Sequence, residues 1–305
     1  MIETENLTKK FGVETAVDSV TLRVDEGEVF GFLGPNGAGK TTTVRMLACL
    51  VAKSSGSATI GDYEIGSKAD QPKIRKMIGL LTENVGLYEE LSAYENLDFS
   101  GRFYKLGEQK RKERIEYLLK MLGLWDKKDA AAGTFSKGMK QKLAIARALI
   151  HDPKVLFLDE PTANLDPEAS KTVRDFILEL KKEKRTIFMN THLLDEAERI
   201  CDRVAILKTR LITIGSPEEL RSSLSGRRVK VQLQQVNDAI ISSVKGMAYQ
   251  IGEVTANSIV INLKDPEKEN PAILRSIQGA GGNVVFVTEV GSSLEDVYLK
   301  LVKGE

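Results

Sequence analysis

Gly34-Pro35-Asn36-Gly37-Ala38-Gly39-Lys40-Thr41-Thr42 is the stretch that decides the fold of this 305-residue chain. It lies between an apolar run, Val29 to Leu33, and a helix-like stretch, Val44 to Leu50. This order predicts a strand, a glycine-rich turn and a helix, whose backbone N–H groups curl round a phosphate at the positive helix end. Lys40 adds a charge for the β- and γ-phosphates, and the Thr41 hydroxyl can ligate Mg²⁺.

A glycine-rich turn before a helix is often no more than a turn. Here Lys40 and Thr41 follow the last glycine directly and stand between a strand and a helix, which is the context that this motif requires. The stretch therefore predicts binding of a nucleoside triphosphate.

The composition describes a globular chain, with 42% hydrophobic and 29% charged residues. A length of 305 residues predicts one large domain or two of ordinary size. The net charge of +1 provides no basic excess for a phosphate backbone, so no nucleic-acid partner is expected. No run of 18 apolar residues occurs and residues 1–5 lack the pattern of a signal peptide, so the protein is expected to stay in the cytoplasm.

Strand-like runs alternate with helical segments over residues 1–215, which predicts an α/β fold with parallel strands in the centre. A helical subdomain is expected at about 84–150, where Ser92-Ala93-Tyr94-Glu95 is a capping box. Residues 216–228 are polar enough for a linker, although Ser216-Pro217 is also a helix-start signal. Residues 229–305 have a β-α-β-β-α-β pattern and a final helix, including a helix expected from Pro271, which predicts a small α+β, ferredoxin-like domain.

Two carboxylates follow a continuous apolar run, Val155-Leu156-Phe157-Leu158-Asp159-Glu160. A buried parallel strand delivers such groups from its carboxyl end into the crevice where ligands bind. Asp159 is then placed to hold Mg²⁺, directly or through water, and Glu160 to act as general base on the attacking water. The alternative is that the two acids only cap the turn into Pro161.

The segment Thr134-Phe135-Ser136-Lys137-Gly138-Met139-Lys140-Gln141 resembles the signature motif of ATP-binding cassette (ABC) proteins, and it precedes the Asp159 strand as in that family. The resemblance implies that Ser136 and the backbone amides around Gly138 bind the γ-phosphate of ATP held by the opposite subunit. Lys137 stands where the family usually has glycine. By itself, a Ser-Lys-Gly turn before a helix is a common feature.

Other family elements follow in order. His192 matches the switch histidine that contacts the γ-phosphate, whereas a histidine without these motifs is more often structural. Asp166 matches the acid of the loop that crosses the dimer interface, and it also fits a helix cap before Pro167. Phe11 matches the aromatic that stacks on adenine, with Val17 packed beside it, although it equally fits a core position. His151, by contrast, is expected to be a surface turn residue.

Glu83 departs from the family pattern, which has a glutamine that coordinates Mg²⁺ and senses the membrane partner. A carboxylate is a harder Mg²⁺ ligand than an amide oxygen, but an ionised one donates no hydrogen bond. Glu83 therefore keeps the metal role in one interpretation and is a solvated loop acid in the other.

The run Ser292 to Leu299 resembles the closing helix in ATPase subunits of ABC-2 type exporters, which include drug-resistance and sodium-export systems. The resemblance implies a P-loop ABC ATPase that uses ATP and Mg²⁺, forms a dimer and drives a separate membrane permease from the inner face of the membrane. Two alternatives remain: a soluble ABC switch without a permease, and a C-terminal domain that binds a regulatory ligand. A GTPase is disfavoured because the guanine-reading Asn-Lys-x-Asp motif is absent.

Overall fold

The computed structural model describes residues 1–224, 227–247, 249–263, 265–290 and 293–303. The chain divides into two compact units, Met1–Ser216 and Pro217–Glu305. Two sequence predictions fall partly outside the described residues: the end of the expected linker at 225–226, and Ser292 in the run expected to close the chain.

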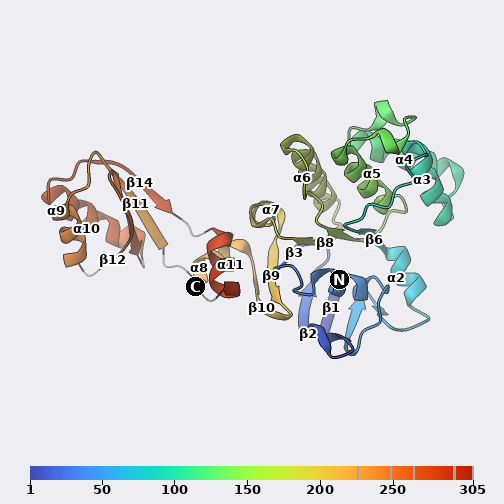
Figure 1. Cartoon of the computed structure of the whole chain (residues 1–305), viewed down its shortest axis with the longest axis horizontal. Helices are drawn as coiled ribbons and strands as arrows, with labels where there is room; N and C mark the ends of the chain where they lie inside the picture. The colour runs from blue at the N-terminus through green and yellow to red at the C-terminus, as the bar shows by residue number, and fades with distance from the viewer. Residues whose placement is uncertain (225–226, 248, 264, 291–292, 304–305) are drawn as a thin grey trace. The chain divides into compact units, whose positions relative to one another are not determined.

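A six-stranded sheet forms the centre of the first unit (Figure 1). Five of its strands are parallel, and β10 pairs antiparallel with β9 at one edge. The three central strands are buried throughout, because both faces of the sheet are covered. This confirms the predicted α/β class. The sheet order is β10 (Arg210–Gly215), β9 (Arg203–Lys208), β3 (Val29–Leu33), β8 (Thr186–Thr191), β7 (Val155–Asp159) and β6 (Ile78–Leu81).

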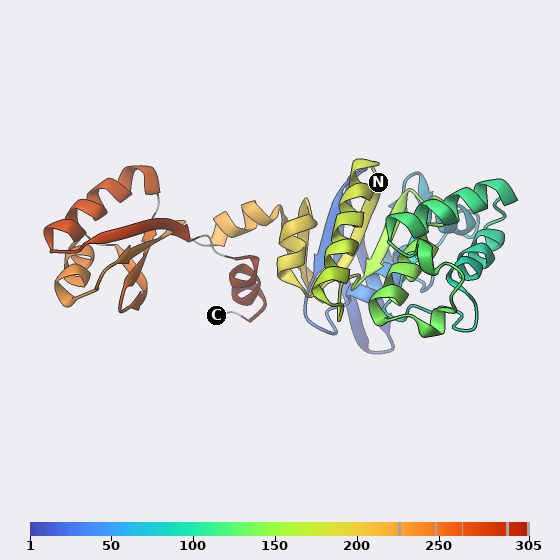
Figure 2. The same cartoon turned by 90° about the horizontal axis from the view of Figure 1, so that it is seen from above.

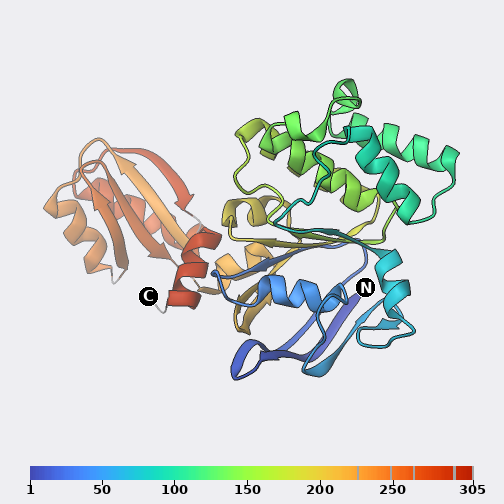
Figure 3. The same ribbon diagram turned by 45° about the vertical axis from the view of Figure 1, so that its right-hand side comes forward.

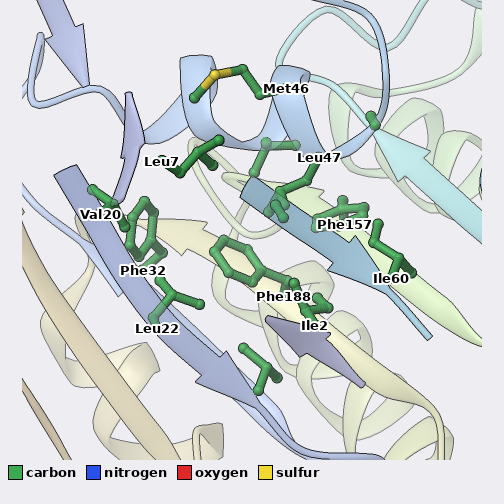
Figure 4. Packing of buried hydrophobic residues seen from close by; sticks show 14 of the residues in the cluster. Ile2, Leu7, Val20, Leu22, Phe32, Met46, Leu47, Ile60, Phe157 and Phe188 are labelled. Carbon is green, nitrogen blue, oxygen red and sulfur yellow. The ribbon is translucent and has the colours of Figure 1, made fainter. Parts of the chain in front are cut away.

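A four-stranded antiparallel sheet covers one face of the parallel sheet. Phe32, Phe157 and Phe188 of the parallel strands share one core with Leu7, Val20 and Ile60 of the antiparallel ones (Figure 4). Helix α1 closes this core with Met46 and Leu47 and is thereby fixed between the two sheets. The elements are β2 (Glu14–Val24), β1 (Ile2–Phe11), β4 (Ser55–Ile60), β5 (Tyr63–Glu64) and α1 (Lys40–Leu47).

Helices cover the other face, as Figure 2 shows from above, and α3, α4 and α5 form a separate group beside β6 (Figure 3). The predicted capping box is present at α3: Ser92 Oγ accepts from Glu95 N at 3.1 Å, and Glu95 Oε2 accepts from Ser92 N at 2.8 Å. The helices are α2 (Gln71–Met77), α3 (Ala93–Phe103), α4 (Glu108–Met121), α5 (Lys137–Leu149), α6 (Pro167–Lys182) and α7 (Leu194–Ile200), with 3₁₀ turns at Trp125–Lys127 and Ala132–Thr134.

His151 lies in a turn, as the sequence predicts, but its side chain is partly buried rather than a surface group. Its ring stacks on Tyr104 with centroids 3.7 Å apart, and Nε2 lies 2.9 Å from the Ile78 carbonyl oxygen. Burial lowers its pKa below 6.5, with a smaller lowering from Arg114. The side chain, which follows the C-terminal end of α5, therefore packs against Tyr104 at the end of α3 and against Ile78 of β6.

The second unit contains an antiparallel sheet in the order β12-β13-β11-β14, with α9 and α10 forming its core with the inward side chains. This order and the β-α-β-β-α-β sequence match the predicted ferredoxin-like topology. Within the described residues, β14 pairs with β11 along one side and forms one edge of the sheet. The elements are β11 (Arg227–Leu233), α9 (Asp238–Gly246), β12 (Gln250–Thr255), β13 (Ser258–Leu263), α10 (Pro266–Gly279) and β14 (Val284–Val290).

Two segments of the second unit add to the sequence prediction. The expected linker 216–228 begins with helix α8 (Pro217–Leu224), as the start signal at Ser216-Pro217 indicates, and α8 contacts α11 (Leu294–Lys303), a packing partner that the sequence does not show. Helix α10 begins five residues before Pro271, because Asp265 caps it and Pro266 occupies its first position. None of the helices in the described part of the chain is long and apolar enough to cross a membrane.

Candidate active site

The loop between β3 and α1 has a backbone that glycine alone accommodates. Gly37 and Gly39 have φ values of 80° and 97°. A Cβ on Gly39 would lie 2.3 Å from the Ala16 carbonyl oxygen, and one on Gly34 would lie 2.3 Å from that of Leu207. Gly39 is also the N-cap of α1 and provides no side-chain cap. The loop therefore brings backbone N–H groups and a helix N-terminus to one place, as anion binding requires.

Lys40 begins α1 and is buried. Its Nζ donates to the carbonyl oxygens of Gly34 at 2.6 Å and Pro35 at 3.1 Å. Burial lowers the pKa of Lys40, while Glu160 and Asp159 act in the opposite direction. The Lys40 ammonium group is thus held by carbonyl oxygens of the same loop whose N–H groups can bind an anion.

Asp159 lies at the end of β7 with both carboxylate oxygens oriented. Thr41 Oγ1 donates to Oδ2 at 3.0 Å, and Asn190 Nδ2 donates to Oδ1 at 3.2 Å. Asn190 is a site residue that the sequence analysis missed. The signal was its place in β8, the neighbour of β7, where it pairs with Asp159.

Glu160 and His192 contact each other across the same sheet edge. His192 Nδ1 lies 2.8 Å from Glu160 Oε1, and the Glu160 N–H donates to the Asn190 carbonyl oxygen at 3.0 Å. Glu160 adopts a φ of 51°, a left-handed conformation that is rare for this residue type. Its other carboxylate oxygen is buried without a hydrogen-bond partner among the described residues. The His192 side chain is more than half exposed and that of Glu160 is mostly covered, and both residues line the cavity.

A cavity of about 740 Å³ joins these groups. Several lining residues were not expected: Glu14, Ala16, Asn84, Val85, Lys140, Gln141, Ala163 and Asn164. The predicted residues on its wall are Phe11, Asn36, Gly37, Ala38, Gly39, Lys40, Thr41, Thr42, Glu83, Lys137, Asp159, Glu160 and His192.

Five predicted residues do not line this cavity. Val17 is fully buried in the core beneath the loop rather than beside the cavity, and Gly34 contributes its carbonyl oxygen to Lys40. Ser136 Oγ accepts from Met139 N at 3.3 Å as the N-cap of α5. Asp166 Oδ1 accepts from Ala169 N at 2.8 Å as the N-cap of α6. A Cβ on Gly138 would lie 2.9 Å from Ala169 Cβ, so the starts of α5 and α6 pack closely.

Phe11 and Glu83 both line the cavity and are both exposed. Lys9 Nζ lies 4.7 Å from the centroid of the half-exposed Phe11 ring. Glu83 lies in the loop after β6. An exposed aromatic face and a carboxylate therefore border the groups around Lys40.

The oxygen donors of Thr41, Asp159 and Glu83 suit Mg²⁺, which prefers oxygen ligands. Within the described residues, no three His, Cys, Asp or Glu side chains gather in a way that could hold a metal by themselves.

Comparison with known proteins covers both units. A family model described as ABC transporter matches residues 17–163, and one described as the C-terminal domain of DrrA1-3-like ATP-binding proteins matches residues 215–302. The linearmycin resistance ATP-binding protein LnrL of Bacillus subtilis is 32% identical and aligns over 99% of this chain and 98% of its own length. The bacitracin transport ATP-binding protein BcrA of Bacillus licheniformis is 35% identical, and it aligns over 100% of this chain and 98% of its own length.

Solved structures show the same core. An ATP-binding subunit of an ABC transporter has a TM-score of 0.67 at 32% identity, covering 73% of this chain and 92% of that one. A dimeric ATP-binding cassette in a post-hydrolysis state, bound to ADP and Pi, has a TM-score of 0.65 at 27% identity, covering 71% and 98%.

The loop at Lys40, with Asp159 and Glu160 at the end of a parallel strand, defines a P-loop ATPase. Within that class, the chain belongs to the ATP-binding proteins of ABC transporters, in the group of ABC-2 type exporters. It is the ATP-hydrolysing subunit of such an exporter, as the sequence analysis predicted.

Proposed function

We propose that two copies of the chain enclose two ATP molecules, each between the Lys40 loop of one copy and the Ser136 end of α5 of the other. Ser136, Gly138 and Asp166 lie outside the wall of their own cavity, which supports a role toward a second chain. A relative of known structure is dimeric. Lys137 lines its own cavity, so we assign it to the chain that holds the nucleotide.

In this proposal the residues of one wall bind the nucleotide. Phe11 stacks on the base, since its exposed ring borders the cavity. The N–H groups from Asn36 to Thr42 surround the phosphates, and Lys40 balances their charge. Thr41, Asp159 and Glu83 would hold Mg²⁺, which when bound would neutralise charge on the phosphate oxygens.

Hydrolysis then depends on Glu160. The Oε2 atom, buried and without a partner among the described residues, accepts a proton from water as the water oxygen attacks the γ-phosphorus. The bond from the γ-phosphorus to the β–γ bridging oxygen breaks, and ADP leaves with that electron pair. His192 holds Oε1 at 2.8 Å, and this contact is the observation that carries the assignment, because it fixes the direction in which Oε2 points.

We further propose a membrane permease as partner, with this subunit at the cytoplasmic face of the membrane. A second cavity, of about 390 Å³, is lined by exposed Leu50, Tyr88, Phe99 and Phe103. It lies along α3, close to the loop that carries Glu83. Such apolar exposure favours a helix of a protein partner.

The test is Glu160→Gln. Loss of the base is expected to lower phosphate release by at least about 100-fold while ATP binding is retained, because the Lys40 loop is untouched. Light scattering should then show a dimer that persists in ATP. Glu14→Gln, which neutralises an acid on the same cavity wall, is the control and should keep the parental rate. Parental turnover by Glu160→Gln would exclude Glu160 as the base.

A further inference from the structure

Three adjoining cavities share one loop. The ATP cavity, a cavity of about 670 Å³ that shares lining residues with it, and the apolar cavity along α3 are each lined by residues of the segment 82–86. Glu83 and Asn84 line the first two cavities, and Gly86 lines the third. This loop, residues 82–86, therefore forms a wall common to the nucleotide side and the apolar side.

The loop has no regular secondary structure, so individual hydrogen bonds determine its position. Arg147 Nη2 donates to the Val85 carbonyl oxygen at 2.6 Å, and Nη1 donates to that of Gly86. Farther along, the Asn96 side chain of α3 binds both the N–H and the carbonyl of Tyr88. The loop is thus attached to the helical group at two places.

The Arg147 contact is suited to couple the position of the loop to that of α5. A guanidinium is a planar fork that engages two carbonyl oxygens in fixed geometry, which a single ammonium does not reproduce. Arg147 is half-buried, and this burial lowers the pKa of its guanidinium. Loss of this side chain would leave two carbonyl groups without their charged donor.

Arg147 lies in α5, the helix that Ser136 caps. Helix α5 therefore carries both Ser136, which is proposed to reach the ATP of the second copy, and Arg147, which holds the loop beside the ATP cavity of its own chain. The 13 residues of α5 span about 20 Å at the usual rise per residue. A displacement at either end of α5 moves the other.

We infer that Arg147 is a positioning residue of the ATPase: by holding Val85 and Gly86 to α5, it sets the place of Glu83 relative to Asp159 and Thr41. The inference rests on the proposed function, because Glu83 and Ser136 have their roles from it.

The experiment uses full-length Arg147→Met and Arg147→Lys. Arg114→Met is the matched control, because Arg114 also donates from a partly buried position to a carbonyl oxygen, that of Leu149, but does not touch the loop. Arg147→Met is expected to lower kcat between about tenfold and 100-fold with KM nearly unchanged, because a misplaced group costs rate rather than nucleotide binding. Arg147→Lys should recover part of the loss.

Two further readouts separate positioning from general destabilisation. Amide hydrogen exchange at residues 82–88 should accelerate in Arg147→Met and stay parental in Arg114→Met. In a double-mutant cycle, Arg147→Met should cost less than about threefold when added to Glu83→Ala, since both act on one element.

Unchanged exchange in the loop, a kcat equal to that of Arg114→Met, or full additivity with Glu83→Ala would overturn the inference. Glu160→Gln measured in parallel distinguishes the two proposals. If Glu160→Gln retains turnover, the proposed catalytic roles fail, whereas the exchange experiment still reports on Arg147.

Discussion

At the residue scale, contacts that its sequence position does not reveal hold His151 in one tautomer. The Ile78 carbonyl oxygen accepts from Nε2–H, which leaves the buried Nδ1 unprotonated and without a partner among the described residues. The charged groups that act on it are Arg114, which lowers its pKa, and Asp152, which raises it. Burial outweighs the opposing effects of the Ile78 hydrogen bond and Asp152, so the folded state favours the neutral imidazole.

This gives a pH prediction. Because the folded-state pKa lies below 6.5, the stability contributed by neutral His151 is present above that pH and is lost as pH falls below it. His151→Phe keeps a ring against Tyr104 but loses the bond to Ile78, so it should be less stable by about 1 kcal/mol at pH 7.5. The difference in Tm between the two proteins should narrow from pH 7 to pH 5. A constant difference would contradict the buried neutral state.

The sequence identifies residues that need a special backbone conformation or that end a buried strand. It misses residues whose role depends on a contact with a distant part of the chain. Gly37 and Gly39 are predictable because their turn requires positive φ. Asp159 and Glu160 are predictable because they end a buried apolar strand. Asn190 and Arg147 are not, since their partners lie 31 and about 60 residues away and no local pattern marks the contact.

At the scale of elements, α5 is the critical helix, because its N-terminus is proposed to complete a site on another copy. Ser136→Arg should abolish steady-state ATP hydrolysis without weakening ATP binding by the monomer. The reason is that the bulky arginine side chain would occupy the space of the phosphates of ATP bound by the second copy. Equilibrium binding and phosphate release measure the two effects separately.

Thr134→Arg is the control for Ser136→Arg, because it places the same cation two residues earlier, at an exposed position. It should retain more activity than Ser136→Arg. Parental turnover by Ser136→Arg would contradict the assignment of this site to the opposite chain.

Most elements were predictable where periodicity and caps agree, as at Ser92 and in β7. The start of α8 was indicated by Ser216-Pro217, but its packing against α11 was not, because α11 lies some 70 residues later in the chain. The start of α10 differed because two prolines offered two possible first positions, and the Asp265 cap favours the earlier one.

At the scale of the whole molecule, each unit has its own hydrophobic core. The fragment 1–216 contains every residue of the ATP cavity and should fold cooperatively and bind ATP as tightly as the full chain. Thermal unfolding and equilibrium nucleotide binding test this. An insoluble fragment, or one without ATP binding, would show that the first unit depends on residues 217–305.

Strand β14 has a practical consequence for handling the protein. It is one edge of its sheet in the described residues, and Val285, Phe286 and Val287 are all exposed there, whereas Val254 is the exposed large apolar residue of β12 at the opposite edge. An apolar edge strand is a template for aggregation in concentrated solution. Phe286→Lys should therefore raise the soluble concentration reached before precipitation, and Val254→Lys on β12 should have a smaller effect.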